Sequence, residues 1–87
     1  MKYTIQCCGP SKDFFLMPEL SIETDTFPNP QELKILLLKY LSPEADKAQA
    51  QSMLDASLVA SKEKILDNQK PIVGNEHLFL LPPVCGG

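Results

Sequence analysis

The segment Met1-Lys2-Tyr3-Thr4-Ile5-Gln6-Cys7 decides the fold, because it is the clearest strand signal in the chain. Every second residue is apolar, which is the period of a β-strand with one buried face. Gly9-Pro10-Ser11 then breaks the pattern, and the run from Lys12 to Pro18 predicts a loop or a short helical turn. Alternation resumes between Leu20 and Thr26. We therefore expect a second strand that pairs antiparallel with the first.

The strongest helix signal begins at Asn29. This residue can cap a helix, Pro30 suits the first helical position, and Glu32 can complete a capping box. The apolar positions that follow have the spacing of one helical stripe. They are Leu33, Leu36, Leu37, Tyr40 and Leu41. We expect this stripe to cover the sheet and the helix to end near Leu41 or Ser42, because Pro43 cannot continue it.

The second half of the chain gives weaker signals. Residues 44–56 are rich in Ala, Gln and charged side chains and predict a weakly anchored helix. Two short strand-like pieces follow, at 58–60 and 64–66. The segment His77–Leu81 is almost entirely apolar, which predicts a central strand covered on much of both faces.

The order of these elements predicts an α+β fold with a mixed sheet of four to five strands packed on one main helix. The first and last strands carry the best apolar runs, and the chain between them is long enough for a crossover. We expect them to be parallel central neighbours, which is a β-grasp (ubiquitin-like) arrangement. The predicted domain spans residues 1–81, and residues 82–87 form a C-terminal tail.

Size and charge restrict the function. A chain of 87 residues has one modest core, so a self-contained enzyme is not expected. The net charge is −3 and all eight cations are lysine, so we expect no nucleic-acid partner. No apolar stretch reaches the roughly 20 residues that cross a bilayer. We expect no membrane partner and a cytosolic protein that begins near Met1.

The cysteines and the single histidine do not predict a metal centre. Cys7, Cys8 and Cys85 are too few for a disulfide scaffold, and neighbours on a strand point to opposite faces. His77 is interpreted as a polar residue at the start of a strand. No metal and no bound cofactor are expected.

The chain ends in Leu81-Pro82-Pro83-Val84-Cys85-Gly86-Gly87. The two prolines stiffen the exit from the last strand, and the glycines have no side chains to obstruct a narrow passage. Six residues from Pro82 span at most about 20 Å. Such an arm can present the α-carboxylate of Gly87 inside a channel of another protein.

This ending resembles the small sulfur-carrier subunits of molybdopterin synthase, within the ubiquitin-like proteins. Their ending is apolar-Pro-Pro-Val-x-Gly-Gly, and Gly74-Asn75-Glu76 is similar to their Gly-Asp-Glu turn before the last strand. The resemblance implies that an adenylyltransferase similar to ubiquitin-activating enzymes uses ATP to adenylate Gly87. A persulfide donor then generates a thiocarboxylate there. Gly86 gives clearance, and Pro82 and Pro83 set the exit direction.

The resemblance also implies a partner, the large subunit of molybdopterin synthase, in a heterotetramer of two small and two large subunits. The sulfur then adds to cyclic pyranopterin monophosphate during molybdenum cofactor biosynthesis. The chain would be the non-catalytic, sulfur-donating subunit of that complex. One departure from the pattern is Cys85, where the family usually has Ser, Thr or Ala. Cys85 is either a small substitute or a nucleophile that attacks the activated glycyl group or its sulfur.

The last expectations concern the surface that docks a partner and the acceptor of the tail. Phe79 and Leu81 beside the tail are expected to dock a partner on an open sheet face, with Cys7 as a neighbour. Two alternatives to the molybdenum role stay open. One is a ubiquitin-like modifier conjugated to proteins through Gly87, and the other is a sulfur carrier for thiamine, tungsten cofactor or another metabolite.

Overall fold

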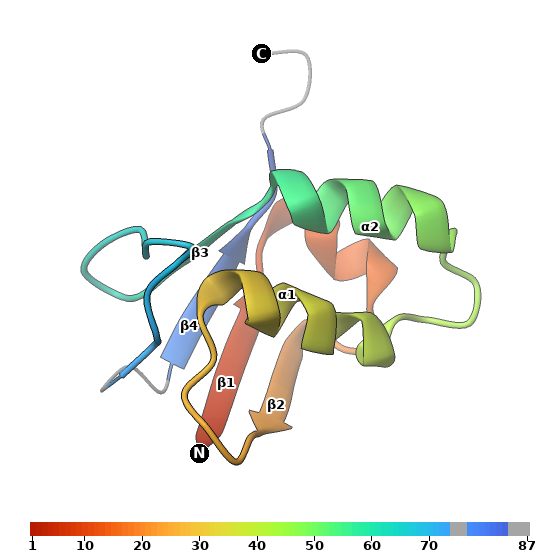
Figure 1. Cartoon of the computed structure of the whole chain (residues 1–87). Coiled ribbons are helices and arrows are strands. Elements are labelled where there is room, and N and C mark those ends of the chain that lie inside the picture. The colour runs from red at the N-terminus through yellow and green to blue at the C-terminus, as the bar shows by residue number, and fades with distance from the viewer. Residues whose placement is uncertain (74–76, 84–87) are drawn as a thin grey trace.

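The computed structural model describes residues 1–73 and 77–83, which form a four-stranded sheet with two α-helices on one face (Figure 1). The strand order is β2-β1-β4-β3. The strands are β1 (Lys2–Cys7), β2 (Glu19–Glu23), β3 (Leu58–Ala60) and β4 (His77–Leu81). The α-helices are α1 (Pro30–Leu37) and α2 (Lys47–Ala56), and the 3-10 helices are η1 (Gly9–Phe14) and η2 (Leu38–Tyr40).

The two central strands are the first and the last, and they run parallel as the sequence predicts. Ile5 of β1 is paired with Leu78 of β4, and Cys7 with Leu80. β2 lies antiparallel to β1 on one side, and β3 lies antiparallel to β4 on the other. β2 ends at Glu23, so the alternation at Thr24 and Thr26 falls in the turn that follows. The α+β prediction with a mixed sheet is confirmed.

α1 begins with the predicted capping box. The Glu32 amide donates to the Asn29 side chain at 2.7 Å, and the Asn29 amide donates to the Glu32 carboxylate at 3.1 Å. Its end differs from the prediction, because the α-helix stops at Leu37 and a 3-10 turn follows. This tighter turn places Leu41 in extended backbone, where it forms a bridge to Phe15. α1 therefore ends before Leu41, and Leu41 instead makes a tertiary contact with Phe15.

Two segments with weak signals in the sequence, residues 9–14 and 47–56, form helices. Residues 9–14 form η1, and Phe15 behind it is buried in the core. Asp46 caps α2 by accepting from the amides of Ala48 and Gln49. α2 contributes Ala50 and Leu54 to the core, so a sparse apolar pattern suffices where tertiary packing buries two of its residues.

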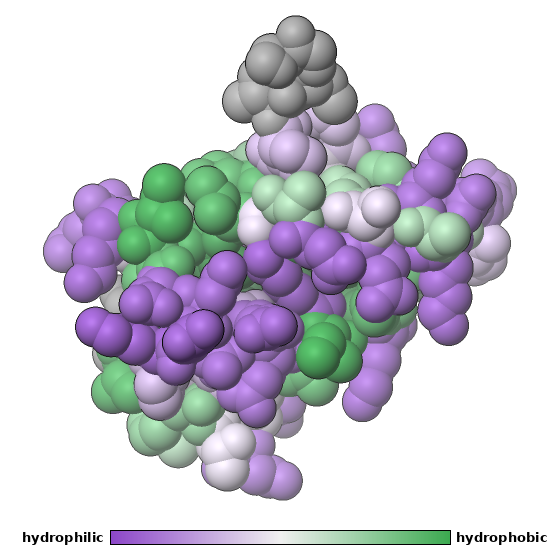
Figure 2. Space-filling view, turned by 45° about the horizontal axis from the view of Figure 1, so that its top comes forward, coloured by the Kyte–Doolittle hydropathy of each residue, from purple (hydrophilic) through white to green (hydrophobic). Residues whose placement is uncertain are grey.

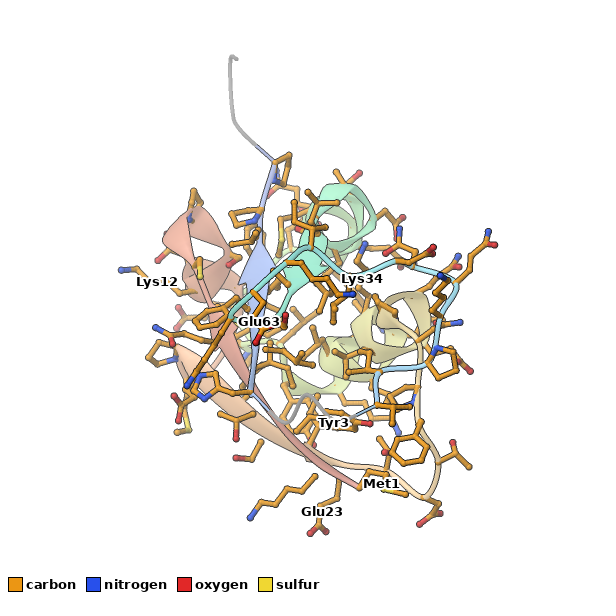
Figure 3. All side chains as sticks on the ribbon, turned by 90° about the vertical axis from the view of Figure 1, so that its left-hand side faces the viewer. Met1, Tyr3, Lys12, Glu23, Lys34 and Glu63 are labelled. Atoms are coloured by element: carbon orange, nitrogen blue, oxygen red, sulfur yellow. The ribbon has the colours of Figure 1, made fainter. Side chains whose placement is uncertain are left out.

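The core lies between the sheet and the helices, and the leucine stripe of α1 faces it. Leu33 and Leu37 are fully buried, and Leu36, Tyr40 and Leu41 are partly buried against the same cluster. The Tyr3 hydroxyl donates to the Ile72 carbonyl oxygen at 2.8 Å, which ties β1 to the segment before β4. Figure 3 shows Tyr3 directed toward that segment.

One expectation about the last third of the chain was wrong, and one was confirmed. Residues 64–66 do not form a strand, because the turn at Ser61 leaves only a single bridge between Ala60 and Ile65. β4 is central, as predicted, and much of both its faces is covered, although to different degrees. Its core face carries Leu78 and Leu80, while His77, Phe79 and Leu81 on the other face are partly exposed.

Candidate functional site

The predicted reactive end of the chain lies outside the described residues. This applies to Val84, Cys85, Gly86 and Gly87, and also to the turn Gly74-Asn75-Glu76. Pro82 and Pro83 are described and follow directly on Leu81, the last residue of β4. The structure therefore defines the root of the tail and the surface around it.

The root of the tail lies against the end of β1. The Cys8 amide donates to the Leu80 carbonyl oxygen at 3.1 Å. This hydrogen bond extends the β1–β4 pairing one residue beyond the end of β1. The next residue, Gly9, has φ of +54°, a conformation that favours glycine. A Cβ atom on Gly9 would lie 3.7 Å from Cγ of Pro82. The chain therefore turns away from the sheet directly beside the first proline of the tail.

A buried serine holds this turn. The Ser11 hydroxyl and the Ser11 amide both donate to the Cys8 carbonyl oxygen, at 2.5 Å and 3.2 Å. Ser11 is fully buried, and its hydroxyl has this acceptor as a partner. Ser11 therefore fixes the path of residues 8–11 beside Pro82. The sequence marked Gly9-Pro10-Ser11 only as a break and did not predict its position next to Pro82.

The face of the sheet away from the helices is apolar along β4 and β3. Phe79 and Leu81, the predicted docking residues, lie on this face, and Leu58 is the cross-strand partner of Leu81. Leu58 is 43% exposed and Ile65, which is bridged to Ala60 on the same face, is 56% exposed. We call Leu58, Ile65, Phe79 and Leu81 the open-face patch. Its exposed apolar side chains can contact a partner protein.

Cys7 is not part of this patch, contrary to the prediction. Its register partner is Leu80, on the core face, and its side chain is 5% exposed. The neighbour of Phe79 on β1 is Gln6. Because successive residues of a strand point to opposite faces, a shift of one position separates Cys7 from the patch completely.

The open face changes character from one edge to the other. Gln6 and Thr4 on β1, with Glu19 and Ser21 on β2, form its polar half. His77 lies at the border, and its ring centroid is 5.3 Å from that of Phe79. Leu58 and Ile65 were missed from the sequence, although the cross-strand pairing of 58–60 with the last strand would have revealed Leu58. The apolar half is the one nearest the root of the tail.

The helical side of the molecule differs from the open face. Figure 2 shows a largely hydrophilic surface over the helices, with hydrophobic side chains gathered toward the side where β3 lies.

A groove between α1 and α2 is lined by Lys34, Asp55 and four amide side chains. Burial lowers the pKa of the Lys34 ammonium, and the charge of Asp55 opposes that shift. Because the ammonium donates to the Ser57 carbonyl oxygen, we assign it a structural role.

Residues 1–73 and 77–83 contain neither a metal-binding cluster nor a membrane-spanning helix. No group of three or more His, Cys, Asp or Glu side chains there is arranged to hold a metal ion. No helix of this part of the chain has the length and apolar character to cross a membrane.

The fold is that of the ubiquitin-like β-grasp proteins, as the resemblance of the sequence predicts. No protein-family model and no curated protein matches the sequence. Among solved structures, the chain is similar to SAMP1 from Haloferax volcanii, with a TM-score of 0.64 and 14% identity. It is also similar to a chain of the protein-protein complex of subunits 1 and 2 of the molybdopterin-converting factor from Helicobacter pylori 26695, with a TM-score of 0.59 and 22% identity. Each match covers 100% of both chains.

Proposed function

We propose that the protein is a sulfur carrier of the molybdopterin synthase type and acts in the cytosol. The observation that carries this proposal is the place of the tail: Pro82-Pro83-Val84-Cys85-Gly86-Gly87 follows the central strand of a β-grasp sheet, at the end where the open face is apolar. The similarity to a chain of the molybdopterin-converting factor complex supports it.

The chemistry starts from a carboxylate that is a poor electrophile. An adenylyltransferase partner transfers AMP from ATP to the Gly87 carboxylate and releases pyrophosphate. A persulfide sulfur then displaces AMP and, after reduction by the donor system, leaves a thiocarboxylate on Gly87. In the synthase, this sulfur is transferred to cyclic pyranopterin monophosphate, and the carboxylate of Gly87 is regenerated.

In this proposal, the described residues bind the partners and direct the tail, and they take no part in bond formation. The open-face patch offers apolar side chains to the adenylyltransferase and to the large synthase subunit. Gly9 and Ser11 hold the end of β1 against Pro82, so the tail starts from a defined point. A general base and substrate-binding cations are supplied by the partners, which accords with a chain that has one histidine and no arginine.

A second candidate uses the same tail. A ubiquitin-like modifier would also be adenylated at Gly87, but its glycyl group would pass to a lysine of another protein. The similarity of the fold to SAMP1 is the observation that supports this second candidate. A carrier for thiamine, tungsten cofactor or another metabolite differs from the first proposal only in the acceptor.

The test incubates the untagged full chain with an adenylyltransferase of the ubiquitin-activating type, ATP and a persulfide donor. We expect intact-mass spectrometry to show one oxygen-to-sulfur exchange, located at Gly87 by fragmentation. A variant that lacks Gly87 should not be loaded. An unchanged mass with an active partner enzyme contradicts the carrier proposal. Higher-mass conjugates of the chain in cell extracts, without thiocarboxylate, would support the modifier instead.

A further inference from the structure

β2 is an edge strand whose outer side has no partner strand in the part of the chain that the structure describes. The strand order β2-β1-β4-β3 leaves it paired with β1 alone (Figure 1). The opposite edge is different, because the Leu66 amide donates to the outer carbonyl oxygen of Val59 in β3 and Ile65 is bridged to Ala60. β2 has no such cover among residues 1–73 and 77–83. An edge of this kind can pair with another extended chain.

The hydrogen bonds at the end of β2 show which of its backbone groups point outward. The Met1 ammonium and the Thr24 amide each donate to the other residue's carbonyl oxygen, at 2.5 and 2.7 Å. In an antiparallel ladder, pairs of this kind alternate with pairs that exchange no hydrogen bond. The register therefore directs the N–H and C=O groups of Glu19, Ser21 and Glu23 away from β1. These three residues offer donors and acceptors to an added strand.

A groove of about 600 Å³ lies beside this edge, between the end of β2 and α1. Its apolar lining residues are Pro28, Ile35 and Leu36, and the Ile35 side chain is 62% exposed. Successive side chains of a strand point to opposite faces. A segment added to β2 would therefore direct every second side chain to the helix side of the sheet, where apolar side chains suit the groove.

The charges at this edge favour a basic occupant. Glu19 and Glu23 are exposed on the open face of β2, and the charged residues that line the groove are Glu23, Asp25 and Glu32. Lys2 is the register partner of Glu23 and offsets part of this charge. Opposite charges on neighbouring strands stabilise their pairing. Basic side chains on the open face of an added strand would therefore meet Glu19 and Glu23.

A second copy of this chain is a poor occupant of the edge. Two β2 strands paired antiparallel about Ser21 would place Glu19 of each copy directly opposite Glu23 of the other. Like charges in that position destabilise a strand pair. The same two glutamates that attract a basic segment thus oppose self-association.

We propose that the outer edge of β2 binds an extended segment of a partner protein in which apolar and basic residues alternate. The segment pairs antiparallel with residues 19–23, its basic side chains lie on the open face, and its apolar side chains lie on the side of the groove. β1 separates β2 from β4, so the occupied edge leaves the open-face patch and Pro82 accessible. This contact goes beyond the proposed function and does not depend on chemistry at Gly87.

The test titrates the full chain with the capped peptide Val-Lys-Val-Lys-Val-Lys-Val and follows the backbone amides by NMR. We expect the amides of Glu19, Ser21 and Glu23 to shift and to become protected from hydrogen exchange. The same peptide with N-methyl groups on its lysine amides should bind about tenfold more weakly, because those amides face β2. N-methyl groups on the valine amides face solvent and should be tolerated. Equal affinities of the two methylated peptides, or amide shifts confined to β3 and β4, overturn the proposal.

Variants of the chain separate the backbone contact from the charge. Ser21→Pro removes the central outward N–H, and proline is tolerated on an edge strand at such a position. We expect its Kd for the lysine peptide to rise about tenfold, whereas Ser21→Thr should bind like the wild type. Unchanged binding by a folded Ser21→Pro overturns the proposal, and if this variant does not fold, the methylated peptides decide.

The charge is tested by reversal at the two edges of the sheet. Glu19→Lys should weaken binding of the lysine peptide by about threefold or more. Glu63→Lys is the matched control, because Glu63 is exposed and follows β3 at the opposite edge. Equal effects of the two reversals contradict a site at β2. Dimers of the free chain that form through the amides of residues 19–23 would show a second copy as the occupant and would also overturn the proposal.

Discussion

The ammonium of Lys34 donates to the carbonyl oxygen of Ser57 at 2.5 Å, and this bond joins α1 to the residue that ends α2. Lys34 is only 7% exposed although it lies on the helical surface. The carbonyl end of a helix attracts a cation, so the contact offsets part of the cost of burying the charge. Figure 3 shows Lys34 between the two helices.

Replacing this lysine should loosen the contact between the helices. We expect Lys34→Ala to lower the free energy of unfolding by about 1 to 3 kcal/mol, because a hydrogen bond to a charged group and the packing of the aliphatic stem are lost. Urea denaturation measures the effect. Lys39→Ala is the matched control, since Lys39 is exposed. Equal effects of the two substitutions would contradict the assignment of Lys34 to the α1–α2 contact.

The hydroxyl of Tyr3 gives a second stability test. Tyr3→Phe leaves the buried Ile72 carbonyl oxygen without this donor, and we expect a loss of about 1 to 2 kcal/mol in the free energy of unfolding. Thermal or urea denaturation with and without the substitution measures it. Tyr40→Phe is the control, because no hydrogen bond from the Tyr40 hydroxyl is formed within the described part of the chain. If Tyr3→Phe is as stable as the wild type, the hydrogen bond between Tyr3 and Ile72 adds nothing to the free energy of unfolding.

Cys7 should make stability fall at alkaline pH. Burial in the core raises the pKa of its thiol from 9.0 to about 11 on folding. Between these values the unfolded chain loses the proton first, so stability present below pH 9 is lost as the pH rises toward 11. The expected loss is on the order of 2 kcal/mol.

The measurement compares wild type with Cys7→Ala. Urea denaturation at several pH values, with a non-thiol reductant, should show a steeper alkaline fall for the wild type. Burial also raises the pKa of Tyr3, but this contribution is common to both proteins. Parallel stability curves would show that the thiolate of Cys7 is accommodated in the folded protein, against the prediction.

The open-face patch should contribute to partner binding. We expect Phe79→Ser to weaken binding to the adenylyltransferase or the large synthase subunit by about tenfold or more, as aromatic residues at interface centres often do. Calorimetric titration of the full chain measures this. Gln6→Ser changes the neighbour of Phe79 in the same cross-strand row and should bind normally. Similar losses in both variants, or none in Phe79→Ser, would place the docking surface elsewhere.

Local signals in the sequence predicted the elements that depend on local physics. The alternation of Tyr3, Ile5 and Cys7 predicted β1, and the capping box at Asn29 predicted the start of α1 at the correct residue. Both signals involve residues only a few positions apart, so their energies do not depend on the rest of the fold. The end of α1 was less predictable, because the bridge between Phe15 and Leu41 shortens the helix.

The site was predicted only in part for a similar reason. Phe79 and Leu81 were correctly assigned to an open face, but Cys7 was placed beside them and lies in the core. Leu58 and Ile65 were not recognised. Their membership of the patch depends on the pairing of β3 with β4 and of residue 65 with residue 60, which are contacts between distant parts of the chain or across a turn.

The sequence by itself determined the four strands that form and the capped start of α1, because periodicity and capping are properties of short segments. The tertiary structure alone decided which face each side chain occupies and what lies at the root of the tail. Strand register sets both, and a shift of one residue exchanges the two faces of a strand. That register buries Cys7, leaves Phe79 partly exposed, and brings the Cys8 amide to the Leu80 carbonyl oxygen and Gly9 beside Pro82.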